Sequence, residues 1–112
     1  MTEARLAASI EASFLMRLVT ANGGFATILA KGDAERGSLL LVVTERGRQV
    51  ALLERMLNAL GEYEWQRSGP ESGSNTSAEW LQKRRRNDPD LWLIELDVPD
   101  AERFIAETTS KG

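Results

Sequence analysis

Four consecutive cations, Lys83, Arg84, Arg85 and Arg86, lead directly into an acidic turn written NDPD. A cluster of this kind can bind the phosphate groups of nucleic acids or other anions. It also has an ordinary explanation, because cations at the C-terminus of a helix stabilise the helix by about 0.3–1 kcal/mol each. Charge runs are more often solvated helix faces than binding sites, so helix-end electrostatics is the favoured interpretation. Contact with an anion or a partner through these four residues is the alternative.

Arg84 has a second predicted role within this run. It lies four residues after Trp80, so in a helix its aliphatic stem can cover the indole ring. Alanine substitutions in the run are expected to cost only tenths of a kcal/mol each. Arg84→Ala is the candidate for a larger cost.

Two carboxylates, Asp88 and Asp90, flank Pro89 and could act as an acid–base pair or hold a divalent cation. Aspartates beside proline far more often form a turn, in which the carboxylate accepts backbone N–H bonds. The chain contains no histidine and no cysteine, so the commonest general base, the thiol nucleophile and the usual zinc ligands are missing. No catalytic residue, cofactor site or metal site is predicted, and an enzyme using Asp and Arg is a weaker alternative.

The chain has three tryptophans, Trp65, Trp80 and Trp92. Together they could form a platform on which nucleic-acid bases stack. Packing in the core or at a protein–protein interface is the commoner use of tryptophan and the favoured interpretation. Trp92 shares one face of a predicted strand with Ile94 and Leu96, so it is expected to be a structural anchor.

Composition and charge limit the class of protein. A chain of 112 residues with 42% hydrophobic and 28% charged residues is typical of one soluble globular domain. Its formal net charge of -3 argues against a protein built mainly to coat nucleic acid. No apolar stretch approaches the roughly 20 residues of a membrane span, and the N-terminal residues do not resemble a secretion signal. The lack of cysteine suits a reducing cytoplasm.

Hydrophobic periodicity and turn residues divide the chain into helices and strands. Residues 2–22 predict a helix with apolar side chains every four positions. Its core-facing stripe is expected to contain Leu6, Ile10, Phe14 and Leu18, widened by Leu15 and Val19, and its polar side is expected to carry Glu3, Arg5, Glu11 and Arg17. The strands expected next are residues 25–31, 38–44, 49–53 and 62–67; they are followed by a helix at 78–86, a strand at 91–98 and a last helix capped by Asp97 and ending near residue 107.

The predicted fold class is α+β. Short connections between the first strands favour an antiparallel meander. Residues 54–60 fit a strand, a turn or a short helix, and a strand running into a turn or short helix is favoured. We expect a single domain, residues 1–112, with a flexible loop at about 68–76 and a mainly antiparallel sheet of four to five strands. The helices are one at the N-terminus, one before the last strand and a short one at the C-terminus.

Three segments carry a resemblance to a known family: the hairpin LLLVVTERGRQVALL, the short WQR segment, and RRRNDPDLWLIELD. The chain resembles the small uncharacterised bacterial proteins of the domain of unknown function 1491 family over most of its length, with a longer Ser/Gly-rich loop before the second helix. The loop 32–37 also looks familial. The resemblance implies that family's architecture and a bacterial cytoplasmic setting, and no activity. The residues that carry a possible family signature, with a structural role expected, are Trp65, Asp88, Pro89, Asp90 and Trp92.

Two classes of function are predicted. The first is a non-enzymatic interaction or accessory domain that self-associates or binds a partner protein through an exposed sheet edge or a tryptophan face. The second is nucleic-acid or anion binding through residues 83–86, which the net charge disfavours. No membrane partner is expected.

Overall fold

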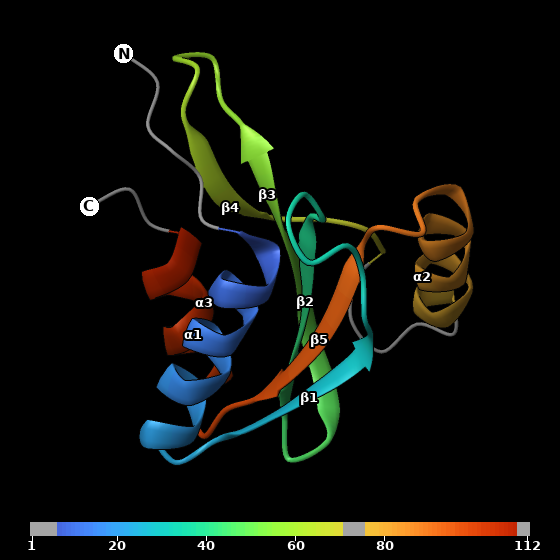
Figure 1. Ribbon diagram of the computed structural model, residues 1–112. Helices are drawn as coiled ribbons and strands as arrows, with labels where there is room; N and C mark the ends of the chain where they lie inside the picture. The colour runs from blue at the N-terminus through green and yellow to red at the C-terminus, as the bar shows by residue number, and fades with distance from the viewer. Residues whose placement is uncertain (1–6, 71–75, 110–112) are drawn as a thin grey trace.

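The computed structural model describes residues 7–70 and 76–109, which form three helices and one five-stranded sheet (Figure 1). This confirms the predicted α+β class. Residues 71–75 of the predicted flexible loop lie outside the described residues. In chain order the elements are α1 (Ala8–Ala21), β1 (Phe25–Ala30), β2 (Leu39–Glu45), β3 (Arg48–Leu57), β4 (Tyr63–Arg67), α2 (Thr76–Asn87), β5 (Trp92–Asp97) and α3 (Ala101–Thr109).

The strand order across the sheet is β1-β5-β2-β3-β4. Every neighbouring pair is antiparallel except β2 and β5, which run parallel with Leu39 opposite Trp92. The sheet is therefore mainly antiparallel, as predicted, but the meander holds only for β2, β3 and β4. The last strand of the chain lies between the first two. Its segment WLIELD is almost wholly buried, so it occupies a central position that is covered on both faces.

Helices cover both faces of the sheet (Figure 1). On one face α1 and α3 pack over a core cluster that includes Leu41, Leu53 and Trp92. On the other face a smaller cluster, which includes Leu40 and Leu93, packs against α2. The alternation predicted for the last strand is confirmed, because Trp92, Ile94 and Leu96 join the first cluster whereas Leu91 and Leu93 join the second.

The segment 54–57, left open by the sequence, belongs to β3, which continues as a strand to Leu57. Its composition would also suit a helix, but β4 supplies an antiparallel partner along this length, with Leu57 opposite Tyr63. The connecting turn is held by Asn58, whose side-chain oxygen accepts hydrogen bonds from the backbone N–H groups of Leu60 and Glu62 at 2.9 Å. Pairing with a neighbour therefore decides the local structure.

The predicted core-facing stripe of α1 is wrong for three of its described members, whereas Val19 is buried as expected and Leu15 packs against the core. Ile10, Phe14 and Leu18 are exposed, Phe14 to 56%. The buried side of the helix instead carries Ala8, Ala12 and Val19. Small alanine side chains let the helix lie close to the sheet, so the larger apolar residues point away from it.

Phe14→Ala is accordingly expected to lower the free energy of unfolding by about 1 kcal/mol or less, because little of the side chain is removed from water. A core-facing phenylalanine would cost about 3–5 kcal/mol. Urea denaturation of the two proteins measures the difference. A loss in the core range would show that the helix is rotated relative to this structure.

Two polar residues also depart from their predicted places. Glu11, expected on the solvent side of α1, is buried and forms an ion pair with Arg55 on β3 at 2.6 Å. Asp97 does not cap α3: it ends β5, and its carboxylate accepts the backbone N–H groups of Arg46 and Gly47 in the β2–β3 turn. The residue before α3 is Asp100, and its carboxylate accepts the N–H of the third residue of the helix at 3.3 Å.

None of the described helices is long and apolar enough to cross a membrane.

Candidate functional site: the basic run and the acidic turn

The basic run, residues 83–86, forms the last turn of α2, where the sequence predicts it. Successive residues of a helix point about 100° apart, so the four side chains do not converge on one ligand. Lys83 and Arg86 are exposed, whereas Arg84 and Arg85 are half-buried and turn toward the protein.

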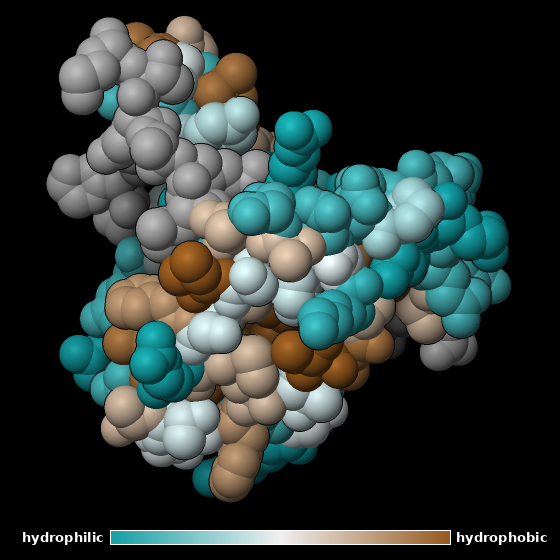
Figure 2. Space-filling view, viewed as in Figure 1, coloured by the Kyte–Doolittle hydropathy of each residue, from teal (hydrophilic) through white to brown (hydrophobic). Residues whose placement is uncertain are grey.

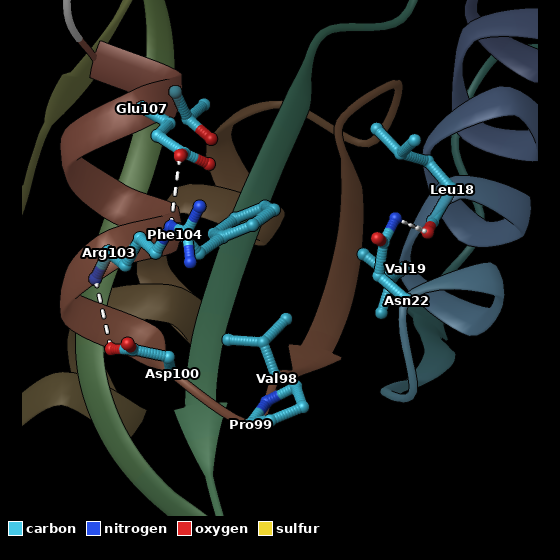
Figure 3. A pocket seen from close by; sticks show the side chains of 10 residues that line it. Leu18, Val19, Asn22, Val98, Pro99, Asp100, Arg103, Phe104 and Glu107 are labelled. Carbon is cyan, nitrogen blue, oxygen red and sulfur yellow. Dashed lines mark hydrogen bonds and ion pairs between the residues drawn. The ribbon is translucent and has the colours of Figure 1, made fainter.

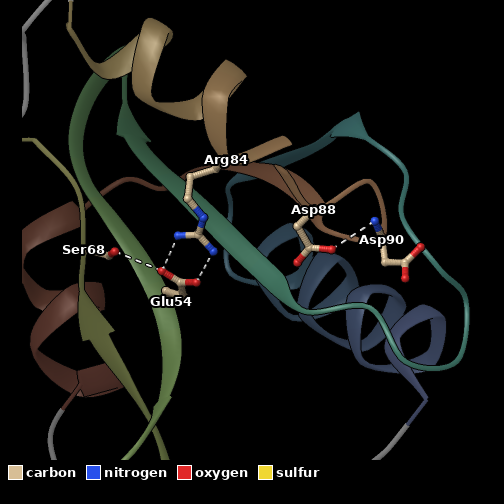
Figure 4. A network of polar contacts seen from close by, with 5 residues as sticks. All are labelled: Glu54, Ser68, Arg84, Asp88 and Asp90. Carbon is tan, nitrogen blue, oxygen red and sulfur yellow. Dashed lines mark hydrogen bonds and ion pairs between the residues drawn. The ribbon is translucent and has the colours of Figure 1, made fainter. Parts of the chain in front are cut away.

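Arg84 connects α2 to β3 (Figure 4). Its two terminal nitrogens donate to the two carboxylate oxygens of Glu54, one of them at 2.8 Å. The hydroxyl of Ser68 donates to the same carboxylate at 3.0 Å. The guanidinium also lies 5.3 Å from the ring centroid of Trp80, so the contact predicted from their spacing is confirmed. Only 13% of the Glu54 side chain and 29% of the Arg84 side chain are exposed.

This pairing shifts both ionisation equilibria. Hydrogen bonds from Arg84 lower the pKa of Glu54, although partial burial acts in the opposite direction. The hydrogen bonds to Glu54 raise the pKa of Arg84. Because the pKa of Glu54 is lower in the folded state, the pair stabilises the fold fully at pH values above the ordinary glutamate pKa. This stabilisation is lost as the pH falls through the lower pKa that Glu54 has in the folded state.

Arg84→Ala is expected to lower the free energy of unfolding by about 1.5–3 kcal/mol at neutral pH, because it leaves a mostly buried carboxylate without its charged partner. This exceeds the tenths of a kcal/mol that helix-end electrostatics alone predicts. Denaturation curves from pH 7 to pH 3 measure the effect, with Arg86→Ala as the exposed control. The difference between wild type and Arg84→Ala should shrink below about pH 4, near the ordinary glutamate pKa. A loss equal to that of Arg86→Ala at pH 7 would contradict this role.

Arg85 holds the end of α2 against the neighbouring loop. One terminal nitrogen donates to the backbone carbonyl of Pro89 at 2.7 Å and the other to that of Lys31 at 2.8 Å. These contacts join the acidic turn to the segment after β1. Arg85 is therefore used within the fold as Arg84 is, and two of the four cations are engaged internally.

The acidic turn is held together by hydrogen bonds that Asp88 accepts from the backbone. The side chain of Asp88 accepts the N–H of Asp90 at 3.2 Å, and its carbonyl accepts the N–H of Leu91 at 3.0 Å (Figure 4). The carbonyl of Asp90 accepts the N–H of Asp33 at 3.0 Å. Neither Asp88 nor Asp90 lines the groove between α1 and α3 or the hollow beside β3 and Ser68.

Trp92 is the anchor of this junction, with 2% of its surface exposed. Its indole N–H donates to the backbone carbonyl of Asp33 at 2.8 Å. Gly32 and Gly37 lie so close that a Cβ on either would meet the carbonyl oxygen of Asp90 and the indole ring. The loop 32–37 and the segment 88–92 therefore form one tightly packed joint between β1, β2 and β5. Both segments resemble the family, and these contacts give each of them a packing role in the fold.

The three tryptophans do not share a surface. Trp65 is half-buried against the core under α1 and α3, with the guanidinium of Arg55 5.5 Å from its ring centroid. Trp80 packs against the opposite cluster. Because Trp92 is buried, no tryptophan platform for bases or a partner exists among the described residues.

With two cations engaged internally, we expect no specific anion site at the basic run. Sulfate should raise the melting temperature of wild type and of a Lys83→Ala/Arg86→Ala variant equally, since excluded salts favour compact states generally. Thermal scans in sodium sulfate, against sodium chloride of equal ionic strength, measure both proteins. A sulfate-specific increase confined to wild type would restore the anion-binding interpretation.

A groove of about 490 Å³ lies between α1 and α3, and the sequence gave no indication of it (Figure 3). Its walls mix apolar and polar side chains, with Leu18 on one side and Phe104 on the other, and with Asp100, Arg103 and Glu107 among the charged ones. The polar groups around it bond to the protein itself: Arg103 donates to Glu107 at 3.1 Å, and the side-chain amide of Asn22 donates to a backbone carbonyl within α1. Asp100 is likewise used within the fold, because its carboxylate accepts the backbone N–H of Arg103.

A second feature missed by sequence reasoning is the exposed apolar surface of α1 and β1. Six exposed large apolar side chains lie within residues 8–30, a segment with only two charged residues, Glu11 and Arg17. Figure 2 shows apolar side chains gathering over these elements, whereas α2 is mainly hydrophilic. The low charge of the segment was the available signal. The six residues are Ile10, Phe14, Leu18, Phe25, Ile28 and Leu29.

Comparisons with known proteins agree with this architecture. A DUF1491 family protein from Caulobacter crescentus CB15, solved by crystallography, is 27% identical, with a TM-score of 0.78 over 89% of this chain and 94% of that one. The NMR structure of a DUF1491 family protein from the same organism is also 27% identical, with a TM-score of 0.76 over 88% of this chain and 91% of that one. The solution structure of a protein from A. tumefaciens is 26% identical, with a TM-score of 0.72 over 87% of this chain and 89% of that one. No curated protein sequence matches the chain. The model of the family of proteins of unknown function DUF1491 matches residues 6–106, and the chain belongs to that family.

Proposed function

We propose that this protein is a non-enzymatic interaction domain of the cytoplasm that self-associates as a homodimer. The observation that carries the proposal is the group of six exposed large apolar side chains on α1 and β1, in a segment poor in charge. Monomeric proteins rarely expose large contiguous apolar patches, and depletion of charge is typical of interface cores. Arg84, Arg85 and Asp88, which could have served chemistry, instead bond to other parts of the fold, and this supports a non-enzymatic role.

A second copy of the chain is the simplest partner for this surface. Charged residues make up 28% of the whole chain. The segment 8–30 has only one charged side chain directed to solvent, Arg17, because Glu11 is buried in its ion pair. Two such surfaces can meet without bringing many like charges together. Most homo-oligomers use this kind of self-complementary twofold contact.

Light scattering coupled to size-exclusion chromatography tests the proposal. The expected mass is twice the 12.4 kDa of the chain, with a monomer fraction that grows on dilution. Because the contact is apolar, the dimer should persist at high salt, where an electrostatic association would weaken. A mass of 12.4 kDa at every concentration up to the millimolar range would overturn the proposal.

A further inference from the structure

We infer that the dimer forms by antiparallel pairing of β1 with β1 of a second copy, which joins the two sheets into one of ten strands. This inference rests on the proposed self-association and names the element that performs it. It follows from a difference between the two edge strands of the sheet, β1 and β4.

The backbone of β1 is paired on one side only. The strand stands at the end of the order β1-β5-β2-β3-β4, so β5 is its one neighbour. Elsewhere in the described part of the chain, no turn or loop backbone hydrogen-bonds to residues 25–30. Helix α1 packs over one face of this end of the sheet and does not pair with its edge. The free N–H and C=O groups of β1 are therefore available to another strand.

The side chains of β1 do nothing to prevent such pairing. Its sequence, FATILA, has no charged residue and no proline, and Phe25 is 75% exposed. Natural proteins protect sheet edges with charges, prolines, bulges or a covering element. Here a single bulge between Ile28 and Ala30 affects the end of the strand, and Phe25 to Ile28 stay in regular register with β5.

The opposite edge of the sheet is protected. Strand β4 carries two charged side chains, Glu64 and Arg67, among its five residues. Pairing through β1 would leave β4 as both outer edges of the ten-stranded sheet. Association through β1 therefore closes at two copies and does not continue into a fibre.

The occupant of the β1 edge is a second copy because the strand is complementary to itself. Antiparallel pairing of a strand with its own copy brings identical side chains close together at the twofold axis, so a charged strand would meet like charges there. Strand β1 is extended and carries no charge. The register with β5 places Ile28 on the α1 face, opposite Ile94, and Thr27 on the other face, opposite Glu95. A twofold axis perpendicular to the sheet keeps these faces matched, so Ala26 and Ile28 meet their counterparts on the α1 face, and Phe25 and Thr27 meet theirs on the other.

Disulfide trapping tests the pairing directly, since the chain has no cysteine. Thr27→Cys and Phe25→Cys lie on one face of β1, and opposed residues near the twofold axis come within disulfide distance. Gln66→Cys, on the opposite edge strand, is the matched control. Under mild oxidation at least one β1 variant should give about tenfold more covalent dimer than the control. Equal yields from all three would overturn the inference.

A second test places a lysine on each edge strand in turn and measures the dissociation constant of the dimer. Thr27→Lys puts a cation opposite Glu95, and Gln66→Lys puts one beside Glu64, whose carboxylate accepts a hydrogen bond from the Gln66 side chain at 3.1 Å. Each new lysine therefore has a carboxylate within reach, and both variants should fold. The dissociation constant of the dimer should rise at least about tenfold in Thr27→Lys and change less than about twofold in Gln66→Lys. A monomeric wild type would end the proposed function itself. A wild-type dimer unaffected by Thr27→Lys would keep self-association and reject β1 as its site.

Discussion

Replacing Trp92 by alanine is expected to lower the free energy of unfolding by about 3–5 kcal/mol. The side chain is 2% exposed and packs in the main core cluster with Ile94 and Leu96. It also supplies the indole N–H that bonds to the carbonyl of Asp33. The substitution therefore creates a cavity and leaves a carbonyl unpaired in the same step. For a domain of this size such a loss is a large part of the total stability.

Trp92→Phe separates the two contributions. It keeps most of the volume and removes the hydrogen bond, so its expected cost is about 1–2 kcal/mol. Chemical denaturation of wild type, Trp92→Phe and Trp92→Ala measures both values. An alanine variant with an unchanged melting temperature would show that Trp92 does not anchor the joint.

Gly32→Ala is expected to cost about 3 kcal/mol or more. A Cβ at this position would lie 2.0 Å from the carbonyl oxygen of Asp90 and 2.7 Å from the indole ring of Trp92. Both neighbours are fixed, the first because it is backbone and the second because it is buried. One of them must move, and either movement disturbs the joint between β1 and β5.

Gly61→Ala is the matched control for this substitution. Its Cβ would meet nothing within 4 Å, but the residue has φ +80°, so it carries only the cost of a left-handed conformation, about 1–2 kcal/mol. Comparing the two by thermal unfolding separates steric overlap from backbone conformation. A Gly32→Ala variant no less stable than Gly61→Ala would contradict the close packing of loop 32–37.

The sequence predicts most elements because their signals are local. The alternation of Trp92, Ile94 and Leu96 is contained within one strand, so it gives the strand and its faces correctly. The position of that strand depends on pairing with β1 and β2, which lie far away in the chain, and periodicity does not encode it. The rotation of α1 was missed because the residues that approach the sheet most closely are alanines, which carry little hydrophobic signal.

The candidate site divides in the same way. The helix end at the basic run and the contact between Trp80 and Arg84 follow from spacing within α2. The partners that engage the two arginines do not, because Glu54 lies 30 residues from Arg84 and the Lys31 carbonyl lies 54 residues from Arg85. From the sequence alone, anion binding therefore stays open as the alternative to helix-end electrostatics.

Small-angle X-ray scattering of the wild-type protein tests self-association through β1 most directly, because it gives mass and dimensions together. The single chain has a radius of gyration of 13.6 Å. Two sheets joined edge to edge, with strands about 4.8 Å apart, place the two centres about 24 Å apart and give about 18 Å. The account predicts this larger value, with twice the mass of 12.4 kDa, at concentrations where the dimer dominates. A value of 13.6 Å with the mass of one chain at all concentrations would contradict it.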